Sequence, residues 1–223
     1  MRGNLAAKAV MKYLAGLILV GFLLFVPAGT IFYWNGWLFI GLLFIPMFFL
    51  GLVLLWKAPD LLEKRLSTKE KENDQKQVVG LSALMFLAGF ILAALDYRFQ
   101  WTQLPGWIVL IASVVLLFSY GMYAEVMREN AYLSRTVEIQ ENQKVIDTGL
   151  YGIVRHPMYS STILLFLSIP LVLGSGLAFL LFLCYPALII KRIKNEEELL
   201  EAGLTGYREY KQKVKYRLIP FVW

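Results

Sequence analysis

The side chains in this sequence that could do chemistry are concentrated in its C-terminal part. The single histidine, His156, stands in the stretch GLYGIVRHPMYSS, between an arginine and a proline and just before a long apolar run. Farther along, Arg192 and Glu196 are four residues apart in KRIKNEEELL, so on a helix both would project from one face. If the fold brings these stretches together, an imidazole, a guanidinium, a carboxylate and the phenol of Tyr159 would converge in one place.

Each of these features also has an ordinary structural explanation. A histidine at a helix start can simply be an end residue at the membrane interface, and the run of glutamates can be a solvated helix. The pair Arg192 and Glu196 can be a surface ion pair, which contributes about 0.3–0.5 kcal/mol. The basic tail can bind lipid headgroups.

The composition predicts where these side chains lie. Of the 223 residues 58% are hydrophobic and 17% are charged, against about 45–50% and 25% in soluble domains. A bilayer core of about 30 Å needs roughly 20 apolar residues to cross it. The sequence therefore predicts an all-α, polytopic integral membrane helix bundle. Its apolar segments are 13–34, 36–56, 78–95, 106–124, 158–173 and 177–190.

The last two segments are short, so they predict either a tilted hairpin or a partial pair that follows fuller spans. They are joined by Gly174-Ser175-Gly176. The charged stretch 57–77 is interpreted as a solvated connector with a short helix from Asp60 to Lys71. The N-terminal apolar run is too long for a signal peptide and is interpreted as a retained anchor.

The basic residues predict the orientation. If the N-terminus is cytoplasmic and six segments alternate, every Lys and Arg except Arg98 falls on the cytoplasmic side. Both termini and the polar segments near the C-terminus are then cytoplasmic. The net charge of +6 is assigned to these loops, because the chain has no nucleic-acid reader motif. We expect membrane lipids and no nucleic acid among its partners.

Several classes of function are excluded or disfavoured. Cys184 is the single cysteine, which excludes an internal disulfide, and with one histidine no metal cluster is expected. The middle of each apolar segment carries no ionisable residue, which argues against a channel or ion pump. No internal repeat suggests a transporter built from duplicated halves.

A hairpin returns the chain to the side on which it started. The stretches 136–159 and 191–220 should therefore meet at the membrane surface. Pro157 suits the first position of the fifth apolar helix, because its missing N–H costs nothing there. We expect two regions: residues 1–127 with the first four membrane helices, and residues 128–223 with a loop, the hairpin, a helical extension and the tail.

This C-terminal pattern resembles the isoprenylcysteine carboxyl methyltransferase family and the related phospholipid N-methyltransferases. The resemblance covers about residues 136–223, and the first four segments match only in being membrane helices. It rests on Val145, Gly149, Tyr151, Arg155-His156-Pro157, Tyr159, Arg192, Glu196-Glu197, Leu200, Tyr207, Tyr210 and Pro220.

The resemblance implies a membrane enzyme that uses S-adenosylmethionine. Carried over by position, the cofactor-binding residues are Gln143, Lys144, Val145, Ile146, Tyr151, His156, Pro157, Met158, Tyr159 and Glu196, and the residue that meets the substrate is Arg192. Eukaryotic members have a histidine where this chain has Gln143. His156 is expected to bind cofactor and not to act as a general base. No G-x-G-x-x-G loop follows a strand, so a soluble Rossmann-type methyltransferase is excluded.

The methyl acceptor is open at this point. A carboxylate is already nucleophilic and needs no base, which favours carboxyl methylation of a lipid-like or prenylated substrate that enters from the bilayer. An amine acceptor would be the reaction of a phospholipid N-methyltransferase. Two other interpretations are a sterol-type reductase that uses NADPH, since such enzymes have a similar R-H-x-x-Y stretch, and a non-catalytic scaffold that binds lipid.

Overall fold

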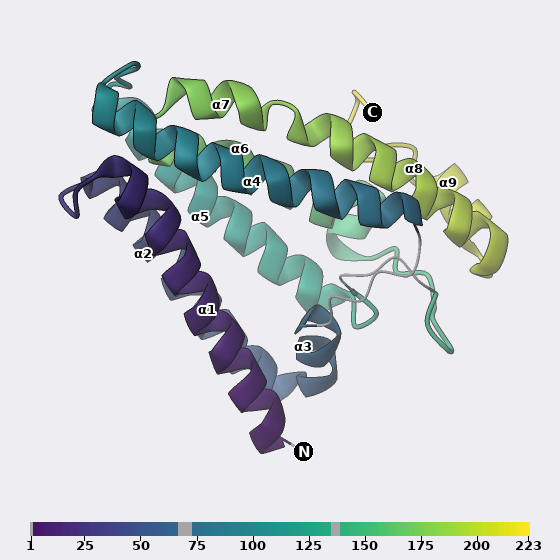
Figure 1. The fold of residues 1–223 in the computed structure, drawn as a ribbon. Helices are drawn as coiled ribbons and strands as arrows, with labels where there is room; N and C mark the ends of the chain where they lie inside the picture. Colours follow the sequence, from purple (N-terminus) through teal and green to yellow (C-terminus); the bar gives the residue numbers. More distant parts are fainter. Residues whose placement is uncertain (1, 67–72, 135–138) are drawn as a thin grey trace.

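The computed structural model describes residues 2–66, 73–134 and 139–223, and this part of the chain is helical with no strand. The predicted class, an all-α polytopic membrane bundle, is confirmed. The helices are α1 (Arg2–Ala28), α2 (Trp34–Lys57), α3 (Pro59–Leu66), α4 (Asn73–Phe99), α5 (Gly106–Glu129), the 3-10 helix η1 (Gly149–Gly152), α6 (Pro157–Val172), α7 (Gly176–Phe182), α8 (Tyr185–Gly203) and α9 (Tyr207–Lys213) (Figure 1).

Five stretches are long and apolar enough to cross a bilayer: Gly3–Ala28, Trp34–Lys57, Lys76–Phe99, Gly106–Glu129 and Gly176–Gly203. The helix α6 is apolar but has 16 residues. At about 1.5 Å per residue it is roughly 24 Å long, shorter than a bilayer core of about 30 Å. The expected final hairpin is therefore present as a short α6 followed by a longer stretch made of α7 and α8.

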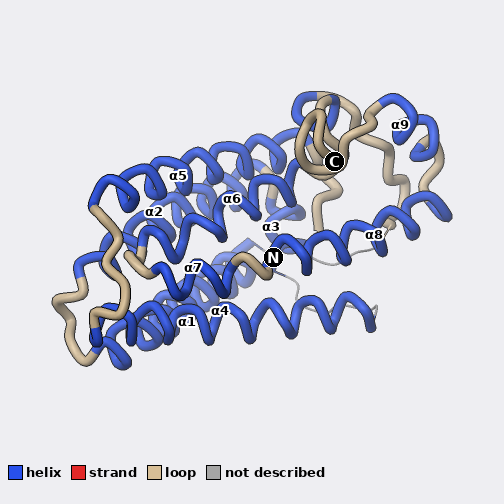
Figure 2. The backbone as a smooth tube through the Cα atoms, turned by 90° about the horizontal axis from the view of Figure 1, so that it is seen from above, coloured by secondary structure: helices blue, strands red, loops and turns tan. Residues whose placement is uncertain are grey.

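A break divides that longer stretch into α7 and α8. Pro186 lies in the first turn of α8 and has no N–H to give to the carbonyl of Phe182, where α7 ends. Phe182 itself is 1% exposed and packs on Gly89 of α4, where a methyl group would overlap its ring. The glycine thus lets α7 lie close beside α4, as both views show (Figures 1 and 2).

The loops that join α1 to α2, α4 to α5 and α6 to α7 lie together at one end of the bundle (left in Figures 1 and 2). Asp96, which is 1% exposed, links two of them. Its carboxylate accepts hydrogen bonds from the Thr102 amide at 2.7 Å and from the hydroxyls of Thr102 and Ser175. Tyr33 adds a bond from its hydroxyl to the carbonyl of Leu173 at 2.6 Å. These bonds fix the positions of the connected helices relative to one another along the bundle axis.

The opposite end of the bundle carries α3, the stretches 130–134 and 139–156, the end of α8, α9 and the C-terminal tail (Figure 1). The tail lies against the chain just before α6. The amides of Arg155 and His156 each donate to a tail carbonyl, those of Tyr216 and Arg217, at 2.9 Å. As predicted, α8 continues well past Ile190, so the start of α6 and the extension of α8 meet at this end.

Candidate active site

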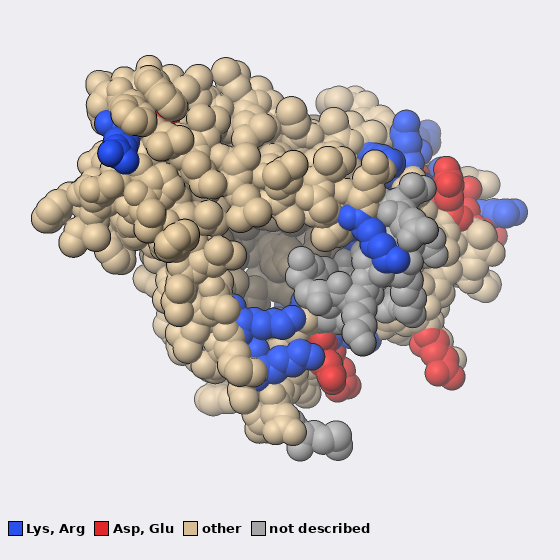
Figure 3. Space-filling model, viewed as in Figure 1, with Lys and Arg blue, Asp and Glu red and all other residues tan. Residues whose placement is uncertain are grey.

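A cavity of about 720 Å³ lies at the polar end of the bundle, with walls from α2, α4, α5, α6, α8 and the stretches 130–134 and 143–146. Pockets for small ligands usually measure about 300–1,000 Å³. Figure 3 shows a hollow in the face of the molecule with Lys and Arg side chains along its lower edge, whereas the surface above it is largely uncharged. The cavity thus joins a charged rim to apolar walls.

The predicted site residues converge on this cavity. All but one of them line it: Gln143, Lys144, Val145, Ile146, Tyr151, His156, Met158, Tyr159, Arg192 and Glu196. The exception is Pro157, which is buried at the start of α6 and shapes the turn that carries its neighbours. Their roles in binding stay predictions, but their meeting in one place is a property of the fold.

Tyr159 joins the two helices that form the polar part of the cavity. Its hydroxyl donates to Oε2 of Glu196 at 2.5 Å and accepts from Nε of Arg192 at 2.9 Å. Arg192 and Glu196 are one turn apart on α8, as the spacing predicted, and Tyr159 lies in the first turn of α6. A cation, a phenol and a carboxylate are therefore held in a fixed row on the cavity wall.

The neighbouring Glu197 has a different environment. It is 3% exposed, and its carboxylate accepts from Nε of Arg155 and Nε of Arg217, both at 2.8 Å. Nε2 of His156 lies 3.2 Å from the same carboxylate. Arg155 also donates to the carbonyls of Val214 and Lys215, at 2.7 and 2.8 Å. Glu197 thus holds the start of α6, the C-terminal tail and α8 together.

Tyr151 also lines the cavity, and hydrogen bonds hold both its hydroxyl and its carbonyl. Its hydroxyl accepts from Nδ2 of Asn130 at 2.9 Å, and its carbonyl accepts from the hydroxyl of Tyr210 at 2.8 Å. Burial raises the pKa of Tyr151 to about 12, although the Asn130 hydrogen bond and the nearby Arg65 cation act in the opposite direction. The side chain is therefore a neutral aromatic surface at physiological pH.

Tyr207, at the start of α9, lines the same cavity and is 4% exposed. Its hydroxyl has no hydrogen-bond partner in the part of the chain that the structure describes. Burial, followed by the charges of Glu197 and Glu196, raises its pKa well above the usual value of a tyrosine. A buried hydroxyl without a partner costs about 1–3 kcal/mol. This one could be satisfied by a ligand in the cavity.

Arg65 is a cavity residue that the sequence did not predict. The interpretation of 57–77 as a solvated connector is wrong for its first part, because α3 buries Leu61 and Leu62. Arg65 lies three and four residues after these leucines and so shares their face of the helix. This spacing is the feature of the sequence from which the position of Arg65 beside the two buried leucines could have been predicted. The remainder of the expected helix, 67–71, lies outside the described residues.

Comparison with known proteins agrees with this geometry. Residues 108–202 match the model of the isoprenylcysteine carboxyl methyltransferase (ICMT) family. The match begins within α5, earlier than the resemblance at residue 136, and it ends before the tyrosine-rich tail. It contains every predicted site residue.

A curated relative lies in a different class of enzyme. Over 91 residues the chain is 30% identical to the Delta(14)-sterol reductase TM7SF2 of Mus musculus. The aligned stretch covers 40% of this chain and 22% of the reductase. The chain thus spans about a fifth of the length of that relative. Residues 108–202, a little under half of the chain, are thus similar to the isoprenylcysteine carboxyl methyltransferase family.

Proposed function

We propose that this protein is an S-adenosylmethionine-dependent membrane methyltransferase that methylates a carboxylate of a lipid-like or prenylated substrate. The observation that carries the proposal is the cavity itself. It combines the row formed by Tyr159, Arg192 and Glu196 with apolar walls from membrane helices. We propose further that this end of the bundle faces the cytoplasm, because the basic loops gather there.

The donor has a sulfonium cation, an amino-acid end, a ribose and an adenine, and the cavity offers matching groups. Glu196 can accept hydrogen bonds from an amine or a hydroxyl, and the ring of Tyr151 can attract a cation. The hydroxyl of Tyr207 is a donor in need of a partner. The backbone from Gln143 to Ile146 borders the same space. These residues therefore fit the donor.

The acceptor would be oriented by Arg192. A guanidinium matches the planar geometry of a carboxylate and can bind it through two parallel hydrogen bonds. Arg192 is 8% exposed, and the bond from its Nε to Tyr159 fixes the direction in which it points. Tyr159 is in turn held by Glu196. The row thus positions a carboxylate at the polar end of the cavity.

Bound S-adenosylmethionine supplies an activated methyl group. The contribution of the protein is then to align a carboxylate oxygen with that group and to exclude water, because methyl transfer is an in-line displacement. An ionised carboxylate needs no general base, which agrees with the engagement of His156 by Glu197. The neutral phenols of Tyr151 and Tyr207 border the site without adding charge.

The rest of the cavity fits the apolar part of a substrate. Its walls include Met47 and Leu54 of α2 and Val79 and Phe86 of α4. These helices are among those long enough to cross a bilayer. A hydrocarbon chain could therefore lie between them while its headgroup reaches Arg192, and it could enter sideways from the membrane.

Transfer of a labelled methyl group from S-adenosylmethionine to N-acetyl-S-farnesyl-cysteine or to a membrane lipid extract tests the proposal. A labelled product that is released by mild base is an ester and supports carboxyl methylation. A base-stable product would instead show an N-methyltransferase. Arg192→Ala and Glu196→Ala should each abolish most of the transfer, whereas a lipid-binding scaffold would show no transfer in any variant.

The likeness to a sterol reductase favours a second candidate, an NADPH-dependent reductase. This likeness covers a part of that enzyme, and the family match and the cavity row favour methyl transfer. Titration of the purified protein with S-adenosylhomocysteine and with NADPH separates the two. Binding of NADPH without a response to S-adenosylhomocysteine would overturn the methyltransferase proposal.

A further inference from the structure

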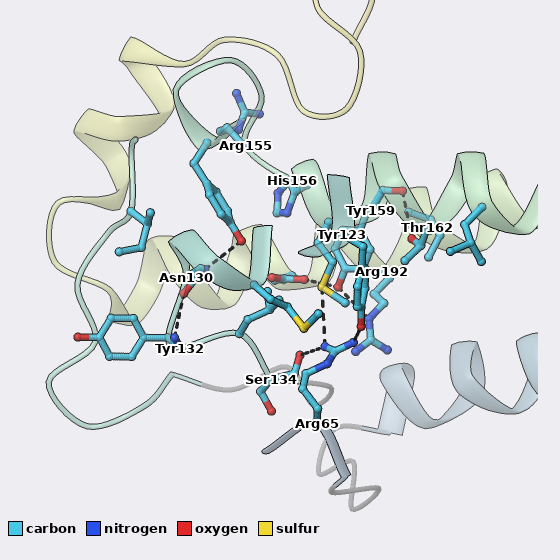
Figure 4. Close-up of a pocket in the computed structure, with 18 of the residues that line it drawn as sticks. Arg65, Tyr123, Asn130, Tyr132, Ser134, Arg155, His156, Tyr159, Thr162 and Arg192 are labelled. Atoms are coloured by element: carbon cyan, nitrogen blue, oxygen red, sulfur yellow. Dashed lines mark hydrogen bonds between the residues drawn. The ribbon is translucent and has the colours of Figure 1, made fainter. Parts of the chain in front are cut away.

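Arg65 brings a positive charge into the cavity from a part of the chain outside the family match. It is half-buried near the end of α3 and lines the cavity. Its NH1 donates to the carbonyl of Ser134 at 3.2 Å and lies 3.8 Å from the sulfur of Met158, and its NH2 donates to the hydroxyl of Tyr123 (Figure 4). The guanidinium carbon lies 5.3 Å from the centre of the Tyr123 ring.

All of these partners are neutral, and no carboxylate among the described residues forms an ion pair with Arg65. The contrast with Arg155 is informative, because that buried arginine has Glu197 as its anion. Withdrawing a cation from water is costly unless an anion accompanies it. An arginine held by neutral acceptors at the edge of a cavity is therefore suited to an anionic group of a ligand.

One contact and one charge effect indicate which part of the cavity this charge serves. NH1 of Arg65 lies 3.8 Å from the sulfur of Met158, which belongs to the predicted donor-binding set. Tyr151 belongs to the same set, and the Arg65 cation acts to lower the pKa of its phenol. Met158 lies in the first turn of α6, a helix of 16 residues whose N-terminal dipole also favours an anion. His156, which is expected to bind the donor, is buried with its Nε2 3.2 Å from the carboxylate of Glu197.

We propose that Arg65 binds the carboxylate of a ligand held in this cavity, and that this ligand is the methyl donor, through its amino-acid end. The inference rests on the proposed function. An acceptor of the proposed class carries a carboxylate too, but the proposed function assigns that group to Arg192, which lies on a different helix, α8. Arg65 then completes the donor site from the N-terminal half of the chain.

The test compares two ligands that differ in one group. S-adenosylhomocysteine and its decarboxylated analogue are titrated into the full chain in detergent or lipid nanodiscs, for the wild type, Arg65→Gln and Arg65→Lys. Charge-assisted hydrogen bonds are among the stronger ones in proteins, so Arg65→Gln should weaken S-adenosylhomocysteine by about tenfold to a hundredfold. The analogue should bind all variants about equally, and Arg65→Lys should recover part of the loss.

Lys64→Gln is the matched control. It removes the same charge from the neighbouring position of α3, its amine contacts the carbonyl of Ala131, and it does not line the cavity. Its affinity for both ligands should equal that of the wild type. If the role of Arg65 is purely structural, Arg65→Gln will lower the affinity for both ligands by the same factor. That result would overturn the inference.

The same variants also identify the source of the carboxylate. If Arg65→Gln leaves S-adenosylhomocysteine unaffected but raises the KM for N-acetyl-S-farnesyl-cysteine at least tenfold, Arg65 binds the acceptor, which supports carboxylate binding but corrects its source. If both quantities stay unchanged, the inference is wrong while the proposed function stands. A wild-type protein that does not bind S-adenosylhomocysteine would contradict the proposed function itself.

Discussion

Nε of Arg192 donates a hydrogen bond to the hydroxyl of Tyr159 at 2.9 Å, which links α8 to the first turn of α6 on the cavity wall. The same hydroxyl donates to Glu196. One phenol oxygen therefore positions both charged residues of the proposed site: Arg192, which is assigned to the substrate, and Glu196, which is assigned to the donor.

Tyr159→Phe removes that oxygen and keeps the ring. Because hydrogen bonds to charged groups contribute about 1.5–3 kcal/mol, we expect methyl transfer to fall by about tenfold or more. The initial rate of labelled methyl transfer measures the effect, and the melting temperature checks that the fold is kept. A variant with the rate of the wild type would show that Arg192 and Glu196 do not depend on Tyr159.

Glu197→Gln should destabilise the fold. It leaves Arg155, His156 and Arg217 without their shared carboxylate, and breaking a buried pair by removing one partner costs about 3–5 kcal/mol. We expect the melting temperature to fall by several degrees. Glu198→Gln is the matched control, because Glu198 is exposed on the next position of the same helix. Equal melting temperatures for the two variants would contradict the anchoring role of Glu197.

Gly89→Ala tests how α7 is seated on α4. The added methyl group would overlap the Phe182 ring, and overpacking of this kind costs about 1–3 kcal/mol. Gly80→Ala places a methyl group on the same helix in open space and should be neutral or slightly stabilising. Thermal unfolding in detergent measures both. A Gly89→Ala protein as stable as Gly80→Ala would show that the close approach of the two helices is not required.

Tyr207→Phe separates ligand binding from stability. The hydroxyl has no partner in the described part of the chain, so its removal should leave the melting temperature of the free protein unchanged or slightly higher. The affinity for S-adenosylhomocysteine should fall several-fold if that hydroxyl bonds to the donor. Unchanged affinity would remove Tyr207 from the donor site.

The pKa of Tyr151 predicts a dependence of stability on alkaline pH. Burial raises this pKa to about 12 from an ordinary value near 10. Between these values the unfolded chain loses the proton that the folded chain keeps, so the free energy of unfolding falls as the pH rises from about 10 to about 12. Tyr151→Phe should make the fall shallower. A variant with the same slope between pH 9.5 and 11.5 would contradict the prediction.

Much of the fold could be predicted from the sequence because it follows from local patterns. Runs of apolar residues give the membrane helices, and the position of Pro157 gives the start of α6. The four-residue spacing of Arg192 and Glu196 gives their shared face. The meeting of the 143–159 segment with α8 followed from the hairpin alone, because a hairpin returns the chain to the side on which it started.

The rest of the site depended on distances that no local pattern fixes. Arg65 is far in sequence from the site residues predicted between 143 and 196. Its position depends on how α3 packs against the end of the bundle. Glu196 and Glu197 are neighbours with opposite environments, because each step along a helix turns about 100° and the rotation of α8 is set by tertiary packing. The engagement of His156 by Glu197 follows from that rotation.

Calorimetric titration of the purified wild-type protein with S-adenosylhomocysteine, beside Glu196→Ala and with NADPH as the competing ligand, tests the central claim most directly. The proposed site predicts saturable binding of S-adenosylhomocysteine to the wild type, loss of most of that affinity in Glu196→Ala, and no binding of NADPH. Binding of NADPH alone, or equal binding of S-adenosylhomocysteine by both proteins, would contradict it.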